Sequence, residues 1–165
     1  LGVDPEPHRD RIAVIHGLKT QRFAELMASQ GIGLRAGIAE LFALARGRNL
    51  AVAVATTTSA PNVDAVSRAA FGKPASALFD VVAAGDEIGA KKPSPDVYLL
   101  ALQRLGMPAA ACVAFEDSRN GLLAAQRAGL RCVVSPSLYT AADDFSGADL
   151  LVPDFVAALP LVAVW

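Results

Sequence analysis

The sequence predicts an α/β protein built on a parallel β-sheet. Four apolar runs, rich in small and β-branched residues and without polar alternation, have the pattern of strands that are buried on both faces of a sheet. They cover residues 50–59, 79–85, 111–117 and 131–137. Helical segments separate them, and this alternation is typical of parallel sheets with right-handed crossovers. A fifth, shorter run at Leu150 is expected to form an edge strand.

The N-terminal part of the chain is expected to be helical. Residues 10–30 carry apolar side chains at helical spacing, interrupted by Gly17, and this pattern predicts a pair of helices. A further helix is expected over about 36–45, stopping at Gly47. The segment 31–37 is the expected boundary between the N-terminal helices and the sheet.

The three crossover helices carry start and stop signals of their own. Ser59 can cap the first, Ser94 with Pro95 at the first helical position opens the second, and Ser118 opens the third. We expect these helices to end before Gly72, Gly106 and Gly129, respectively.

Composition and charge exclude several classes of partner. The 165 residues are 53% apolar, enough for one domain with a sizeable core. The 15 basic and 16 acidic side chains are dispersed, which provides no field for nucleic acid or for a membrane surface. No apolar stretch reaches the roughly 20 residues that span a bilayer. Cys112 and Cys132 are expected to be free core thiols. We therefore expect a cytoplasmic monomer.

Polar side chains gather where the predicted strands end. The first strand ends in Thr56, Thr57, Thr58 and Ser59, the second leads to Lys91 and Lys92, and the third ends in Glu116, Asp117 and Ser118. Ligands of open α/β sheets bind beyond the carboxyl ends of the strands, so these groups should share one edge. Singly, they could be helix caps, solvated lysines or a partner of a helix dipole. Together, they fit a phosphate with Mg²⁺.

Three stretches resemble motifs of a known family. ATTTS at 55–59, GAKKPSPDVY at 89–98 and EDSRNGLLAAQRAG at 116–129 follow successive predicted strands. They look like the second, third and fourth motifs of haloacid dehalogenase-like (HAD) hydrolases, and are most similar to the CbbY-type and β-phosphoglucomutase-like group. The resemblance extends from about Lys19 to Leu151. It implies a Rossmann-like parallel sheet flanked by helices, with part of a helical cap at residues 1–35 and a core at 36–165 that lacks its first strand.

The resemblance also implies roles for individual residues in phosphoryl transfer. Thr56 matches the hydroxyl that binds the transferring phosphoryl group, with Thr57 assisting through its backbone amide and Thr58 through its side chain. Lys92 matches the lysine that bridges nucleophile and phosphate.

Further roles concern the metal and the substrate. Asp117 matches the direct Mg²⁺ ligand, Glu116 the acid that reaches the metal or its waters, and Ser118 a supporting residue that also caps the helix. Lys19 and Arg35 are candidate contacts from the cap or hinge to a second anionic group of the substrate.

The first motif of the family is missing from this sequence. That motif is Asp-x-Asp, in which the first aspartate attacks phosphorus and the second is the general acid and base. No Asp-x-Asp occurs in the 165 residues, and neither Asp4 nor Asp10 follows an apolar strand. In the family, the motif ends a central strand between the threonine strand and the acidic strand. We therefore expect a nucleophile upstream of Leu1, or another segment in this position, and we expect the 165 residues alone to be inactive.

The predicted function is that of a Mg²⁺-dependent phosphatase of a small phosphorylated sugar, either a monophosphate or a bisphosphate, through an aspartyl phosphate. One alternative is a β-phosphoglucomutase-like mutase, although Ser59 stands where that mutase has a lysine. Another is a non-catalytic protein that binds phosphate or a partner. A signalling receiver domain also combines an acidic pair, a threonine and a Lys-Pro, but in a different order along the chain.

Overall fold

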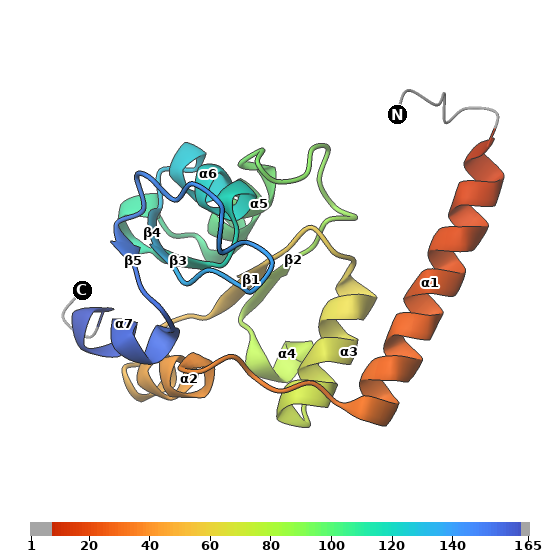
Figure 1. Ribbon diagram of the computed structural model, residues 1–165, viewed down its shortest axis with the longest axis horizontal. Coiled ribbons are helices and arrows are strands. Elements are labelled where there is room, and N and C mark those ends of the chain that lie inside the picture. Colours follow the sequence, from red (N-terminus) through yellow and green to blue (C-terminus); the bar gives the residue numbers. More distant parts are fainter. Residues whose placement is uncertain (1–7, 163–165) are drawn as a thin grey trace.

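The computed structural model describes residues 8–162 and confirms an α/β fold of parallel strands flanked by helices (Figure 1). Asp4 lies outside the described residues. The strands are β1 (Ala53–Ala55), β2 (Val81–Ala83), β3 (Val113–Glu116), β4 (Arg131–Val134) and β5 (Leu150–Leu151). All pairs are parallel, and they form two sheets with the orders β1-β2 and β3-β4-β5. All five predicted strands are present, and each is shorter than the run that predicted it.

The two sheets share one hydrophobic cluster and are linked by the side chain of Lys92, without a strand pair between them. Within residues 8–162, β1 pairs only with β2, and β3 pairs only with β4. Direct pairing of β1 with β3 would have ruled out a strand between them, and it is not found. Lys92 Nζ donates hydrogen bonds to the Ala55 carbonyl of β1 at 3.0 Å and to Glu116 Oε1 of β3 at 2.5 Å.

Helices cover the strands from two sides. They are α2 (Ile38–Gly47), α3 (Ala60–Phe71), α4 (Ala75–Leu78), α5 (Asp96–Leu105), α6 (Arg119–Arg127) and α7 (Phe155–Val162), with a 3₁₀ turn at Ala109–Ala111. Alternate residues of a strand face opposite ways. Accordingly Cys132 and Val134 of β4 pack in the cluster that contains α5 and α6, whereas Val133 packs with α2 and α7. Burial raises the pKa of the Cys132 thiol to about 12, and both cysteines are free, as predicted.

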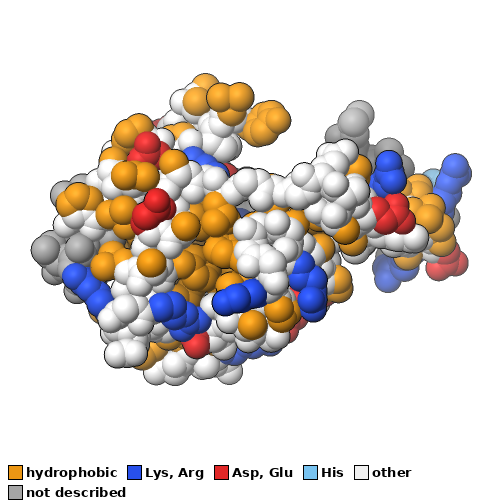
Figure 2. Space-filling view, turned by 90° about the horizontal axis from the view of Figure 1, so that it is seen from below, with side chains coloured by type: hydrophobic (Ala, Val, Ile, Leu, Met, Phe, Trp, Pro, Cys, Tyr) orange, Lys and Arg blue, Asp and Glu red, His pale blue; other side chains and the backbone are white. Residues whose placement is uncertain are grey.

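Helix α1 (Arg9–Gln30) stands apart from this core (Figure 1). It is continuous over 22 residues, so the predicted break at Gly17 is wrong. An interior glycine costs a helix only about 1 kcal/mol relative to alanine, which is too little to end one of this length. None of its residues is buried, and it packs on α3. Figure 2 shows the helix projecting from the body of the molecule. No helix within residues 8–162 has the length and apolar character needed to cross a membrane.

The start and stop signals correctly predicted where the crossover helices lie, but not every contact of their capping residues. Ser118 Oγ accepts a hydrogen bond from Gly121 N at 3.2 Å, as expected of a capping serine. Ser59 occupies the cap position of α3, but its hydroxyl makes no capping bond. Pro95 is the cap residue of α5 and not its first helical residue, because the helix begins at Asp96. The short apolar segments that form α4 and α7 were not predicted as helices.

Candidate active site

The threonine run after β1 folds into a tight turn at the head of α3. Thr56 N donates to the Ala83 carbonyl at 3.0 Å, which extends the pairing with β2. Thr56 Oγ1 accepts a hydrogen bond from Thr58 N at 3.3 Å, and Thr58 Oγ1 accepts one from Asn62 Nδ2 at 2.8 Å. The hydroxyl groups of Thr56 and Thr58 are therefore held at fixed positions beyond the end of β1.

Gly85 allows the loop after β2 to lie against this turn. Its backbone N–H donates to the Thr58 carbonyl at 2.7 Å. A Cβ at this position would lie 2.1 Å from the Thr57 carbonyl oxygen, so any side chain would push the two loops apart. The absence of a side chain at Gly85 thus contributes directly to the position of Thr57 and Thr58.

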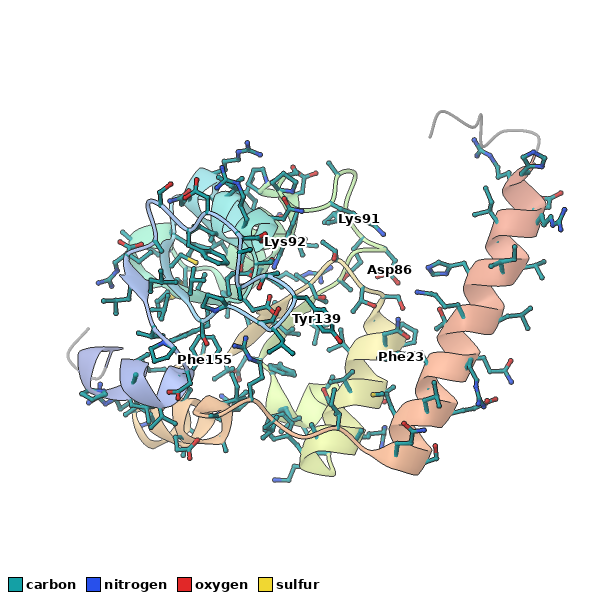
Figure 3. The ribbon with its side chains drawn as sticks, viewed as in Figure 1. Phe23, Asp86, Lys91, Lys92, Tyr139 and Phe155 are labelled. Atoms are coloured by element: carbon teal, nitrogen blue, oxygen red, sulfur yellow. The ribbon has the colours of Figure 1, made fainter. Side chains whose placement is uncertain are left out.

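Lys92 lies between the threonine turn and the acidic pair. Its side chain is 14% exposed, and its ammonium group bonds to Ala55, next to Thr56, and to Glu116, next to Asp117. Figure 3 shows Lys92 inside the core, whereas Lys91 and Asp86 lie on the side toward α1. Two arrangements would have excluded the predicted site: Thr56 and Asp117 at opposite sheet edges, or Lys92 buried away from both. Neither is found.

The two adjacent carboxylates at the end of β3 occupy different environments. The Glu116 side chain is 8% exposed, and its Oε1 accepts hydrogen bonds from Lys92 Nζ and from Tyr98 Oη. The Asp117 side chain is 49% exposed. The repulsion expected of neighbouring carboxylates is thus offset by a buried cation and donor on one side and by solvent on the other. A Cβ at Gly121 would lie 1.9 Å from Glu116 Oε2, so this glycine leaves room for the buried carboxylate.

Arg35 comes from the linker between α1 and α2 and lies beside Asp117. Its Nη1 is 3.9 Å from Asp117 Oδ2, a long contact between two partly exposed groups. Its Nη2 donates to the carbonyl and hydroxyl of Ser135 and to the carbonyl of Pro136, each at 2.9 Å. Arg35 therefore ties the linker to the end of β4, and its contact with substrate stays a prediction.

A cleft of about 380 Å³ separates α1 from the loops that follow β1 and β2. Lys19, a predicted binding residue, lies in its wall. The other lining residues are His16, Thr57, Thr58, Ser59, Asn62, Gly85, Asp86 and Lys91. Sequence reasoning did not select His16, Asn62 or Lys91, because each has an ordinary structural explanation and only the folded chain brings them together. Ser59 Oγ and Asn62 Oδ1 are buried and have no hydrogen-bond partner among residues 8–162.

The carboxylates at the end of β3 suit a hard cation. Within residues 8–162, no three His, Cys, Asp or Glu side chains cluster as a complete metal cage. Mg²⁺ usually binds proteins through one or two carboxylates and keeps waters and substrate oxygens as further ligands. The half-exposed carboxylate of Asp117 therefore suits Mg²⁺ better than a metal that needs four protein ligands, whereas Glu116 Oε1 is already bonded to Lys92 and Tyr98.

This chain is similar to known proteins of one group. The family model of haloacid dehalogenase-like hydrolases matches residues 3–129. Protein CbbY of Rhodobacter capsulatus is 56% identical over 152 residues, which are 92% of this chain and 67% of that protein. CbbY of Rhodobacter sphaeroides in complex with phosphate has a TM-score of 0.89 and 56% identity, covering 92% of this chain and 68% of that one. A mutant of it in complex with xylulose-(1,5)bisphosphate has a TM-score of 0.86 and 57% identity, covering 87% and 64%. The chain spans about two thirds of the length of these relatives.

Proposed function

The chain belongs to the haloacid dehalogenase-like hydrolase family, and on this premise we propose that it acts as a Mg²⁺-dependent phosphatase of a small phosphorylated sugar. The position of Lys92 is the observation that carries the proposal. Its ammonium group bonds to the backbone beside Thr56 and to the carboxylate beside Asp117. This bonding supports a site in which a hydroxyl, a cation and a metal-binding carboxylate would surround one phosphoryl group.

These residues would bind and stabilise the transferring phosphoryl group. Catalysis of phosphoryl transfer depends mainly on positioning and on offsetting negative charge. The Thr56 hydroxyl and the Thr57 backbone N–H would donate to phosphoryl oxygens, with Thr58 assisting through its side chain. Lys92 would offset the charge that develops on those oxygens.

Asp117 would hold the Mg²⁺ directly, with Glu116 reaching the metal or its waters and Ser118 supporting the turn into α6. Bound there, the metal ion would offset further charge on the phosphoryl oxygens. The Asp117 carboxylate is half exposed and its contact with Arg35 is 3.9 Å long. Exposed ion pairs contribute little free energy, so Arg35 would not prevent metal binding.

The nucleophile of this mechanism is proposed to come from a strand outside the 165 residues. The chain contains no Asp-x-Asp, and β1 and β3 are joined through Lys92 without pairing to each other. A strand between them that ends in Asp-x-Asp would place its first aspartate beside Lys92. Sequencing the gene upstream of Leu1 tests this point: we expect an apolar run that ends in Asp-x-Asp, and a gene without one would favour a non-catalytic, phosphate-binding protein.

The cleft supports a sugar substrate with a second anionic group. His16, Lys19 and Lys91 supply basic side chains along its walls. Thr57 and Asp86 add polar side chains to the same walls, and these would bond to hydroxyl groups of a sugar. The bisphosphate bound by the CbbY relative has both features, and we therefore propose a sugar bisphosphate as the preferred substrate.

Phosphate release by the full-length protein tests this function. With Mg²⁺ and a panel of sugar monophosphates and bisphosphates, we expect inorganic phosphate from at least one bisphosphate, with a lower KM than for the matching monophosphate. Removal of Mg²⁺ with a chelator and the variant Asp117→Asn should each abolish release. Isomerised product without free phosphate would favour the mutase, and no reaction with any substrate would contradict both enzymatic functions.

A further inference from the structure

Tyr98 contacts both members of the buried ion pair at the candidate site. It belongs to α5 and is 8% exposed. Its hydroxyl donates a hydrogen bond to Glu116 Oε1, the same oxygen that accepts from Lys92 Nζ. Lys92 Nζ also lies 4.6 Å from the centroid of the Tyr98 ring, within the range of a cation–π contact. The tyrosine therefore holds the carboxylate through its hydroxyl and the ammonium group through its ring.

The Tyr98 hydroxyl fixes one oxygen of the Glu116 carboxylate. It donates its proton to Oε1, the oxygen that also accepts a hydrogen bond from Lys92 Nζ. A second donor on this oxygen restricts the rotation of the carboxylate, which in turn fixes where Lys92 can bond.

We propose that Tyr98 is a positioning residue for Lys92. This inference rests on the proposed function, in which Lys92 offsets charge on the transferring phosphoryl group. Without the hydroxyl, Glu116 keeps only Lys92 as donor to Oε1, and the pair can rotate as a unit. The ammonium group would then leave its bond to Ala55 and its place between the two sheets. Lys92 would act mainly on the charge that develops on the phosphoryl oxygens in the transition state. Misplacement of its ammonium group should therefore lower kcat more than it raises KM.

Two tyrosine variants of the full-length protein separate positioning from packing. Tyr98→Phe removes one hydroxyl and keeps the ring, so we expect the melting temperature to change by less than about 5 °C. We expect kcat to fall about tenfold while KM changes less than about twofold, since a hydrogen bond to a charged group is lost. Tyr139→Phe removes the other phenolic hydroxyl of the chain from a side chain that is 97% exposed, and should leave kcat and KM unchanged.

The ammonium group of Lys92 offers a readout that needs no turnover. In ¹H–¹⁵N spectra, a buried and hydrogen-bonded lysine ammonium exchanges slowly with water, and its signal can be assigned by its loss in Lys92→Arg. We expect this signal to disappear or to exchange faster in Tyr98→Phe and to persist in Tyr139→Phe. An unchanged ammonium signal in Tyr98→Phe would overturn the proposal, as would equal losses of kcat in the two tyrosine variants. If no sugar phosphate were hydrolysed, the signal would still test the role of Tyr98 independently of the proposed function.

Discussion

Helix α6 follows the acidic pair of the candidate site and α1 lines its outer cleft, and the two helices are held very differently. Four of the nine residues of α6 are buried, whereas none of the 22 residues of α1 is. Helix α6 follows directly on the acidic pair, and α1 contributes His16 and Lys19 to the outer cleft. The groups that would handle the phosphoryl group are thus held by the core, and those that would select the rest of the substrate come from a helix packed on one neighbour. We expect changes in the core to affect turnover and stability, and changes in α1 to affect substrate affinity.

The largest effect is expected from Lys92→Ala, with Lys91→Ala as the matched control. Loss of Lys92 removes a cation from the phosphoryl site and leaves Glu116 buried without its ionic partner. We expect kcat to fall about 100- to 1,000-fold, and the free energy of unfolding to fall by about 3 kcal/mol. Lys91 lies in the exposed wall of the cleft, so its loss should change mainly KM. Similar losses of kcat in both variants, measured by phosphate release, would contradict the expected difference between the core lysine and the cleft lysine.

A second, smaller effect is expected from Gly85→Ala. A Cβ would lie 2.1 Å from the Thr57 carbonyl, and the backbone of the threonine turn would have to move. Overpacking of this kind typically costs about 1–3 kcal/mol, and here it should also lower phosphate affinity. In Gly89→Ala the new Cβ would be 3.9 Å from its nearest neighbour, Asp96 Oδ2, so stability should change by less than about 0.5 kcal/mol. Urea denaturation of both variants measures the difference, and equal stabilities would contradict it.

Loss of an α1 side chain that lines the cleft should act on affinity and leave stability nearly unaltered. Lys19→Ala removes an exposed side chain that lines the cleft. We expect the KM for a sugar bisphosphate to rise about three- to tenfold, with kcat unchanged and the free energy of unfolding within about 0.5 kcal/mol of the parent. The KM for a monophosphate should change less, and an equal rise for both substrates would argue against a second anion site at Lys19.

The smallest effect is expected from Gly17→Ala in α1. No other described residue lies within 4 Å of the added Cβ, and alanine favours a helix by up to about 1 kcal/mol over glycine. We expect a slight rise in melting temperature by calorimetry. Gly31→Ala should have the opposite sign, because Gly31 has a φ of +67°, where an L side chain is strained. A fall in melting temperature for Gly17→Ala would show that α1 gains from flexibility at that position.

The outcomes for Gly17 and for the strands show what local sequence patterns can predict and what they cannot. Strand positions could be predicted because a run of apolar residues has few other ways to be buried. The break at Gly17 could not, since one unfavourable residue is outweighed by the favourable residues on either side of it. Pairing also shortened every predicted strand, because strand ends depend on a neighbour's register and not on their own residue types.

The candidate site divides in the same way. By itself, the sequence determined which polar groups follow the strands. It also determined that these groups share one edge, because parallel strands place their carboxyl ends together. The order of the motifs identified the family of the chain. Only the tertiary structure decided that Glu116 is buried against Lys92 and Tyr98 while Asp117 is half exposed, and that His16 lines the cleft. The burial of a charged group and its choice of partner depend on residues far away in the chain. Neither the spacing of the motifs nor the composition shows which of these distant residues come into contact.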